Sequence, residues 1–294
     1  MTAITKWNYR TLLFASIFIV LHLTSMGQKK PPPYFQPDWT RPYESFRIVG
    51  NLYYVGTYDL ACYLITTPSG HILINTGLDE SINSIRASVE KLGFKFSDIK
   101  ILLATHAHHD HVGAFAAIRK ETGAKILINE NDALELADGG ESDYAMGGDG
   151  ILFEPVKPDS LLHKNDTIRF GGMEILPLHH PGHTKGATSF LFDIKDTDRS
   201  YRVLIANMPT LLNGVNLSGM PGYQNIGKDY TVTFDGLKNL QFDIWLASHA
   251  AQFKLHTKRK PGDLYNPKAF IDRAGYDKTL EGYKHLFLSK LKGN

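Results

Sequence analysis

The chain has 294 residues, of which 43% are hydrophobic and 21% charged, a composition typical of a globular protein with a sizeable core. Its 32 Lys and Arg residues nearly balance its 30 Asp and Glu residues, and the run Lys258-Arg259-Lys260 is too short to indicate a nucleic-acid partner. A single cysteine, Cys62, excludes an intramolecular disulfide.

Residues 1–27 have the features of a secretory signal peptide. Lys6 and Arg10 precede an apolar run from Thr11 to Leu23, and Ser25-Met26-Gly27 then supplies a small-residue cleavage pattern. The apolar run is too short for a stable transmembrane span, although a retained N-terminal anchor is the alternative. We therefore expect an exported protein that has no membrane association after the signal is removed.

Residues 28–45 are rich in proline and aromatic residues, which predicts an extended arm, and residues 46–294 are expected to form a single domain. Apolar runs in the first part of this domain predict strands over 46–55, 60–66 and 71–75. An amphipathic helix over 81–93 follows from the helical spacing of four apolar residues, Ile82, Ile85, Val89 and Leu92.

Strands and helices alternate along the rest of the chain. A strand over 99–104 leads to a helix over 112–122, a strand over 125–129 and a short helix over 131–137. After the glycine-rich loop 138–150, a hairpin is expected over 167–178 and a strand starting near residue 188. A strand over 201–206, a helix over 230–240, a strand over 242–247 and a last helix over 267–290 follow in that order. This alternation predicts an α/β fold.

A histidine-rich cluster follows the strand predicted over 99–104 and reads His106-Ala107-His108-His109-Asp110-His111. His183 and His249 also lie in segments that follow predicted strands. Loops at strand ends are the usual place for ligands in α/β folds, and imidazole and carboxylate are ordinary ligands of zinc. The cluster therefore predicts a metal centre.

Two sets of ligands can be formed from these residues. Side chains alternate along an extended loop, so His106 and His108 point to the same side and can bind one zinc ion together with His183. Asp110, His111 and His249 then supply a second set of three ligands. Three protein ligands leave a coordination position for water, as in catalytic zinc sites, so two zinc ions per chain and a hydrolase are predicted.

Two further histidines have open roles. His109 lies inside the cluster, and His180 lies three residues before His183. For each of them, a structural role and contact with metal or substrate both remain possible on the sequence alone.

The motifs resemble those of the metallo-β-lactamase superfamily. The resemblance rests on the run from Thr105 to His111 followed by Gly113, on Pro181-Gly182-His183-Thr184, and on the strand-end His249, and it covers about residues 45–290. It implies a four-layer αβ/βα sandwich, in which two mixed β-sheets are flanked by helices and the metals lie at one edge of the sheets.

Within this superfamily the chain is most similar to subclass B3 metallo-β-lactamases. Other branches place a Cys or a bridging Asp at the second metal, yet residues 201–228 contain no Asp, Glu or Cys. Asp110, His111 and His249 instead complete the second site, as in subclass B3. Met208 occupies the place where many members have a Ser that hydrogen-bonds a metal-bound water, and a thioether cannot donate that bond.

The resemblance implies a reaction, a substrate and a location. The expected activity is hydrolysis of the lactam amide of penicillins, cephalosporins and carbapenems by zinc-bound hydroxide, which confers antibiotic resistance. The substrate is a small molecule, the protein is expected to be monomeric, and a signal peptide on such an enzyme implies the periplasm.

The resemblance also implies roles for individual residues. Asp110 would orient the nucleophile, and Tyr223 would help to stabilise the oxyanion at the carbonyl. Thr210 would bind the carboxylate of the substrate, with Met208 nearby.

Two other functions are compatible with the same ligands. One is a superfamily hydrolase that acts on lactones or thioesters. The other is a non-catalytic periplasmic zinc-binding protein, which would close each coordination sphere with a further side chain such as His109 or His180.

Overall fold

A computed structural model describes residue 29 and residues 34–293 of the chain. The predicted signal peptide lies outside the described residues, and the division at residue 46 between an arm and a single domain stays a prediction. Within the described part of the chain, no helix is both long enough and apolar enough to cross a membrane.

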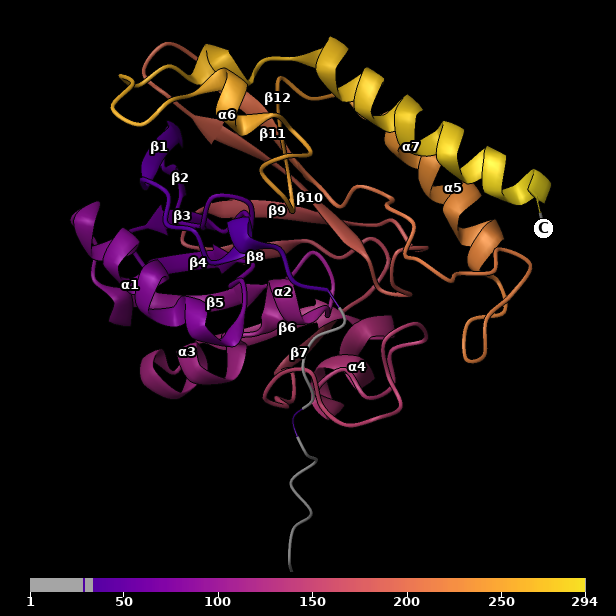
Figure 1. Cartoon of the computed structure of the whole chain (residues 1–294). Helices are drawn as coiled ribbons and strands as arrows, with labels where there is room; N and C mark the ends of the chain where they lie inside the picture. The colour runs from indigo at the N-terminus through magenta and orange to yellow at the C-terminus, as the bar shows by residue number, and fades with distance from the viewer. Residues whose placement is uncertain (1–28, 30–33, 294) are drawn as a thin grey trace, which may run out of the picture.

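Two mixed β-sheets lie between layers of helices (Figure 1). The first sheet has the strand order β1 to β7, antiparallel from β1 to β4 and parallel from β4 to β7. Its strands are β1 (Phe46–Val49), β2 (Leu52–Tyr54), β3 (Tyr63–Thr67), β4 (Gly70–Ile74), β5 (Ile99–Leu103), β6 (Lys125–Asn129) and β7 (Ser160–Leu162).

The second sheet has the order β12-β11-β10-β9-β8, and within it β11 and β12 are parallel while the other neighbours are antiparallel. Its strands are β8 (Ile168–Phe170), β9 (Met173–His179), β10 (Thr188–Lys195), β11 (Ser200–Ala206) and β12 (Ile244–Ala247). The α-helices are α1 (Ile82–Lys91), α2 (His109–Val112), α3 (Phe115–Thr122), α4 (Ala133–Asp138), α5 (Ile226–Lys238), α6 (Leu255–Lys258) and α7 (Arg273–Gly293).

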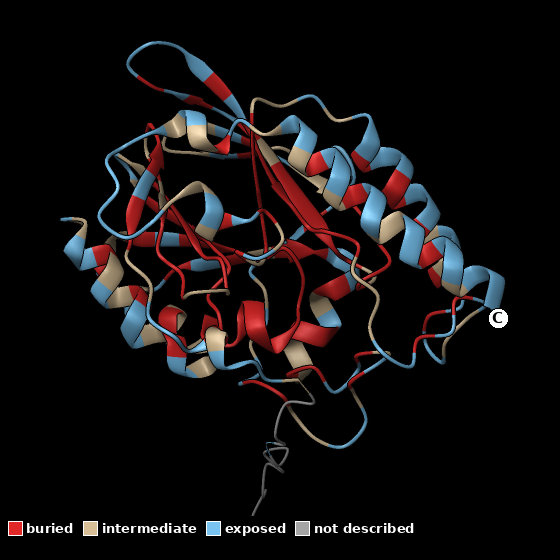
Figure 2. Cartoon of the chain, turned by 45° about the horizontal axis from the view of Figure 1, so that its top comes forward, coloured by how far each residue is buried: buried red, intermediate tan, exposed pale blue. Residues whose placement is uncertain are grey.

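Strand β4 of the first sheet is buried on both faces, so its sequence from His71 to Ile74 is mostly apolar. In β4, Ile72 and Ile74 pack in the core shared with the second sheet, whereas Leu73 between them packs with α1 and α3 on the other face. The helices α5 and α7 cover the second sheet and contribute buried aromatic residues to the shared core. Figure 2 shows this arrangement as buried strands between helices that expose their outer faces. The predicted sandwich of mixed sheets and flanking helices is confirmed.

Several predicted elements are correct in place but divided. The segment 46–55 forms two strands, β1 and β2, because the chain turns at Gly50, where φ is 51° and a Cβ would lie 2.4 Å from Ile194. The helix predicted over 112–122 is split into α2 and α3 at Gly113, whose backbone N–H donates to the carbonyl of Gly77 at 2.9 Å. A Cβ at Gly113 would lie 2.5 Å from the backbone nitrogen of Asp79, so a larger residue does not fit there.

Two other predicted elements have different bounds. The last helix is a 3₁₀ turn (Pro267–Phe270) followed by α7. The strand predicted over 60–66 begins at Tyr63, because Leu60 pairs instead with His249 and the backbone N–H of Ala61 donates to Ser248.

Asn75 connects the ends of β4 and β5 at the edge of the first sheet. Its φ is 61°, a left-handed conformation that Asn tolerates better than most residues. Its side-chain oxygen accepts hydrogen bonds from the backbone N–H of Thr105 at 2.9 Å and from the Thr105 hydroxyl at 3.2 Å. These bonds fix the start of the loop that carries the histidine cluster.

We expect Asn75→Ala to lower the free energy of unfolding by about 2–4 kcal/mol, since it leaves a buried N–H without an acceptor and forces Ala into a left-handed conformation. Asn75→Gly also leaves the N–H without an acceptor but adopts the left-handed conformation without strain, so its loss should be smaller. Urea unfolding of both variants measures the difference, and equal losses would contradict this account of Asn75.

Candidate metal centre

The predicted ligands meet at one edge of the two sheets. His106 and His108 lie in the loop between β5 and α2, and His183 lies in the loop between β9 and β10. Asp110 and His111 are in α2, and His249 follows β12. A hydrogen bond of 2.7 Å from the backbone N–H of Thr188 to the carbonyl of Thr105 joins the two sheets at this edge.

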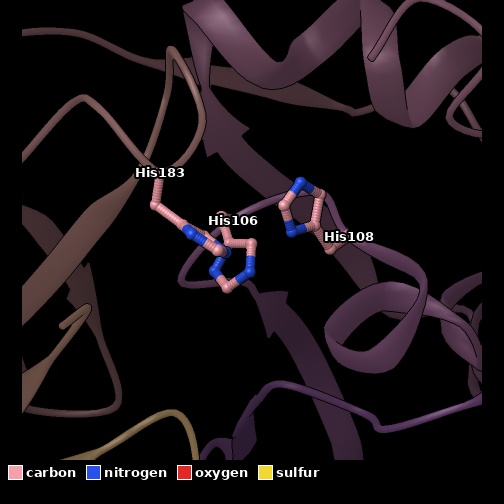
Figure 3. A group of neighbouring side chains, drawn as sticks. All are labelled: His106, His108 and His183. Atoms are coloured by element: carbon pink, nitrogen blue, oxygen red, sulfur yellow. The ribbon is translucent and has the colours of Figure 1, made fainter. Parts of the chain in front are cut away.

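The first group consists of His106, His108 and His183, whose ligand atoms all lie within 4.8 Å of one another. Their ring centroids are 4.6 to 4.7 Å apart. Figure 3 shows the three imidazoles converging from two separate loops. All three side chains are buried, so the group is shielded from bulk water.

The second group consists of Asp110, His111 and His249. The Oδ2 atom of Asp110 lies 3.2 Å from Nε2 of His111 and 3.4 Å from Nε2 of His249. The ring centroids of His111 and His106 are 4.2 Å apart, so the two groups adjoin each other. The structure thus brings all six predicted ligands together.

Three of the histidines are oriented by hydrogen bonds on the side of the ring away from the group. Nδ1 of His183 donates to the carbonyl of Thr210 at 2.9 Å, and Nδ1 of His249 lies 2.9 Å from Oδ2 of Asp59. Nε2 of His108 lies 3.2 Å from Oδ2 of Asp143. Each contact leaves the other ring nitrogen free for a metal, as in known carboxylate–histidine–zinc arrangements.

The donor set fits a transition metal. Nε2 of His106 is buried and has no hydrogen-bond partner among the described residues, and Nε2 of His111 contacts only the Asp110 carboxylate, at 3.2 Å. A buried polar atom without a partner destabilises a protein, and such an atom where six potential ligands meet indicates an absent ligand. Nitrogen and carboxylate oxygen donors in two groups of three suit zinc, which takes such ligands and leaves a position open at catalytic sites.

The charge states of several ligands favour metal binding at neutral pH. Burial, together with the nearby His108 ring, lowers the pKa of His183 to about 3, which keeps its imidazole neutral. Burial alone would raise the pKa of Asp110, but His111 and His249 hold it well below its usual range.

His249 and His108 have raised pKa values, in contrast to His106, His111 and His183. Burial disfavours the charged ring, yet hydrogen bonds to Asp110 and Asp59 outweigh burial and raise the pKa of His249 to about 9. In the metal-free protein, this ring is therefore protonated at neutral pH.

Asp132 connects the two loops that carry the first group. Its fully buried carboxylate accepts hydrogen bonds from the backbone N–H of Ala107 at 3.1 Å and from the Thr184 hydroxyl at 2.8 Å. The backbone N–H of Gly186 donates to its other oxygen, and a Cβ at Gly186 would lie 2.6 Å from Asp132. Ala107 lies between His106 and His108, and Thr184 follows His183, so Asp132 fixes the distance between all three ligands.

Two buried acids lie behind His108. Glu135 and Asp143 form, with this histidine, a further set of ligand atoms within 4.8 Å of one another. Burial and the adjacent Asp143 raise the pKa of Glu135 well above its usual range, which favours the protonated acid. Because Nε2 of His108 already contacts Asp143, we interpret this set as support for the histidine.

A cavity of about 360 Å³ opens onto the ligands, a size within the usual range of small-molecule sites. Its lining includes Asn207, Met208 and Thr210 and, from the segment before β1, Tyr34, Gln36 and Trp39. The hydroxyl of Thr210 lies 3.0 Å from Nδ1 of His183.

Tyr223 is not among the residues that line this cavity. Its ring contacts that of Tyr144 at 5.1 Å between centroids, and its buried hydroxyl has no hydrogen-bond partner in the described part of the chain. The catalytic role expected of Tyr223 stays a prediction.

The two histidines with open roles have different surroundings. His109 lines the cavity, with its ring centroid 5.9 Å from that of Trp39. His180 is buried outside the cavity lining, and its Nδ1 lies 2.7 Å from the Ser189 hydroxyl. The environment of His180 is that of a structural residue.

Sequence reasoning missed the carboxylates that orient the ligands. Asp132 follows the end of β6, which is parallel to β5, so its position at the same edge could have been expected. Asp59 lies in a turn, and no sequence pattern relates it to His249, which is 190 residues away. Asp143 lies in the glycine-rich loop, whose path the sequence does not determine.

We expect Asp132→Asn to weaken zinc binding at the first group by about 10- to 100-fold, because an amide N–H₂ replaces one of the accepting oxygens and the loops separate. Thr184→Ser, which keeps the hydroxyl donor, is the matched control and should bind zinc normally. Zinc content after dialysis against a zinc buffer measures the effect. Full zinc retention by Asp132→Asn would show that this carboxylate does not set the ligand spacing.

Zinc binding at pH 7 should release about one proton from His249, because its pKa of about 9 means that the metal-free ring carries a proton the metal must displace. The affinity of the second group should accordingly fall as the pH is lowered below 9. An indicator dye in weakly buffered solution measures the release, and His249→Ala serves as control. Equal release by this variant and by the unaltered protein would contradict the assignment.

Comparison with known proteins supports the geometry. A family model described as the metallo-beta-lactamase superfamily matches residues 56–197. A β-lactamase structure from Chitinophaga pinensis has 58% identity and a TM-score of 0.87, and the match covers 88% of this chain and 98% of that chain.

Two other solved structures are similar over comparable lengths. A class B3 di-zinc metallo-β-lactamase from an Alaskan soil metagenome has 56% identity and a TM-score of 0.87, covering 89% of this chain and 99% of that one. A metallo-β-lactamase from Elizabethkingia meningoseptica has 51% identity and a TM-score of 0.89, covering 91% and 99%. The resemblance inferred from the sequence motifs is therefore confirmed, and the chain belongs to the metallo-β-lactamase superfamily, with extensive similarity to its class B3 members.

Proposed function

We propose that this protein is a zinc-dependent β-lactam hydrolase that opens the lactam amide. One observation carries the proposal: two adjoining groups of three nitrogen and oxygen ligands face a cavity of about 360 Å³. The identities of 51% to 58% to solved β-lactamases support the same reaction.

The residues divide between two zinc positions. His106, His108 and His183 would hold one ion, and Asp110, His111 and His249 would hold the other. Bound zinc supplies Lewis-acid chemistry, which polarises a carbonyl and makes water acidic enough to act as a nucleophile near neutral pH.

The side chains around the cavity position the reactants. The carboxylate of Asp110 lies where the two groups adjoin, so it can accept a hydrogen bond from the attacking water and orient it. The hydroxyl of Thr210 lies in the cavity wall beside His183 and can donate to the carboxylate of a β-lactam. Met208 offers an apolar contact there and no proton donor.

The proposal extends to substrate range and location. Penicillins, cephalosporins and carbapenems share the lactam amide and a nearby carboxylate, so the same contacts serve all three, and their hydrolysis would confer antibiotic resistance. The signal peptide predicted at residues 1–27 supports export to the periplasm, where a monomer would meet these compounds.

A lactone or thioester hydrolase is the second candidate, because it would use the same first group of histidines. Its branches carry a bridging Asp after the strand that corresponds to β11, whereas Asn207 and Met208 follow β11 here. A non-catalytic zinc-binding protein would need a fourth side chain on each ion. His180 does not line the cavity, which leaves His109 as the nearest candidate.

The test compares turnover of a carbapenem, a cephalosporin, a penicillin, a lactone and a thioester by the zinc-loaded protein. We expect β-lactam hydrolysis that is lost with a chelator and restored by zinc. His183→Ala should lower kcat/KM by about 100-fold or more, since it removes a ligand of the first ion. His163→Ala, at an exposed histidine outside the cavity, is the control.

Each other result points to a different function. Cleavage of the lactone or thioester without β-lactam turnover would overturn the substrate assignment and retain the metal centre. Zinc binding without turnover of any compound would favour the non-catalytic protein.

A further inference from the structure

The side chain of Asp59 touches both the second group of ligands and the N-terminal arm, by which we mean residues 34–45. Its Oδ2 atom lies 2.9 Å from Nδ1 of His249 and also accepts a hydrogen bond of 3.2 Å from the indole N–H of Trp39. Its Oδ1 atom accepts a hydrogen bond of 3.0 Å from the backbone N–H of Ala251. One carboxylate oxygen is therefore shared by a predicted metal ligand and a residue of the arm.

The contact between Asp59 and His249 has no competing ion pair among the described residues. Within the part of the chain that the structure describes, His249 is the ion-pair partner of Asp59, and no Lys or Arg competes for the carboxylate. The Asp59 side chain is only 18% exposed, so water has limited access to it. Its orientation therefore depends on the N–H groups of His249, Trp39 and Ala251.

The arm is held against the turn that contains Asp59. The backbone N–H of Asp59 donates to the carbonyl of Asp38 at 3.2 Å, and that of Tyr58 donates to the carbonyl of Arg41 at 2.8 Å. The Arg41 guanidinium lies 3.9 Å from the centroid of the Tyr58 ring, which in turn stacks on His256 at 3.6 Å. The 3₁₀ turn Pro37–Trp39 is thereby fixed, and Trp39 is only 8% exposed.

Trp39 also contacts the metal centre directly. Its ring centroid lies 5.9 Å from that of His249, and its side chain forms part of the cavity wall. The arm thus reaches His249 by two routes, one through the ring contact and one through Asp59.

We propose that Asp59 is a positioning residue for the second metal and that the arm, through the indole N–H of Trp39, strengthens binding of this metal. This inference rests on the proposed function, since it concerns the second of the two zinc positions. A carboxylate that accepts from a histidine fixes the tautomer and orientation of the ring and raises its basicity as a ligand. The Trp39 N–H on the same oxygen restricts rotation of the carboxylate, so less disorder must be overcome when the metal binds.

The first metal provides an internal reference. Its ligands His106, His108 and His183 are oriented by Thr210, Asp132 and Asp143, whereas the Asp59 carboxylate contacts His249, Trp39 and Ala251. Removing the contacts of Asp59 should therefore weaken the second metal selectively. A general loss of folding would weaken both.

The test is a titration of the metal-free protein with Co²⁺, followed by visible absorption for each equivalent and by metal analysis after dialysis. Three variants are compared with the unaltered protein. Asp59→Asn removes the charge and replaces an accepting oxygen with a donor, and Trp39→Phe removes the indole N–H and keeps an aromatic ring. Asp277→Asn is the matched control, because it makes the same chemical change at an exposed carboxylate of α7 that pairs with Arg273 and not with Asp59 or the arm.

For Asp59→Asn we expect the Kd of the second Co²⁺ to rise about 10- to 100-fold, as for other outer hydrogen-bond partners of metal ligands. For Trp39→Phe we expect a rise of about 2- to 10-fold, which corresponds to one lost hydrogen bond. The first Co²⁺ should bind normally in all variants, and Asp277→Asn should bind both ions as the unaltered protein does. The double variant that carries Asp59→Asn and Trp39→Phe should raise the Kd of the second Co²⁺ by less than the product of the two separate increases, because both substitutions act through the same carboxylate oxygen.

Three outcomes would overturn the inference. Two equivalents of Co²⁺ in the unaltered protein with an unchanged second Kd in both variants would refute the role of Asp59 and leave the proposed function intact. A weakened second Kd in Asp59→Asn but not in Trp39→Phe would refute the contribution of the arm. Binding of only one Co²⁺ by the unaltered protein would refute the two-metal function itself, and this inference with it.

Discussion

The metal centre depends on buried ligand atoms that the protein alone does not fully satisfy. Nε2 of His106 lies in the interior without a hydrogen-bond partner among the described residues, and Nε2 of His111 contacts only the Asp110 carboxylate. Burial of such atoms costs free energy, and the cost is offset only when a ligand binds them. The fold therefore holds in place an arrangement that is unfavourable by itself and becomes favourable with metal.

Carboxylates outside the ligand groups make that arrangement rigid. Asp132 joins the loops of the first group, Asp143 supports His108, and Asp59 supports His249. Each of the three connects segments that are far apart in the sequence. As a result, the ligand spacing is set by hydrogen bonds across the sheet edge, and loops that would otherwise move are held at distances suited to a metal ion.

Much of this organisation could be predicted from local patterns. The strand over 125–129 and the helix near 81–93 follow from apolar spacing, and their observed bounds, β6 and α1, agree closely with the prediction. The spacing of the histidine cluster and its position after a strand were sufficient to select six side chains that the fold does bring together. Periodicity failed where backbones approach closely, as at Gly50 and Gly113, because such contacts depend on segments distant in sequence.

The same limit applies to the site. No local sequence pattern identifies Asp59 or Trp39 as part of the site. Their importance comes from Oδ2 of Asp59, which contacts both Nδ1 of His249 and the indole N–H of Trp39. The role that the resemblance implies for Tyr223 stays a prediction, since its hydroxyl is buried and Tyr223 is not among the residues that line the cavity. Local chemistry thus selects candidate ligands, and only the fold shows what orients them.

The most direct test of the central claim is crystallographic. Crystals grown with zinc should give two anomalous peaks at the zinc absorption edge, each about 2.0–2.2 Å from its nitrogen and oxygen ligands. One peak should lie among His106, His108 and His183 and the other among Asp110, His111 and His249. A single peak, or a peak whose ligands include none of these groups, would contradict it.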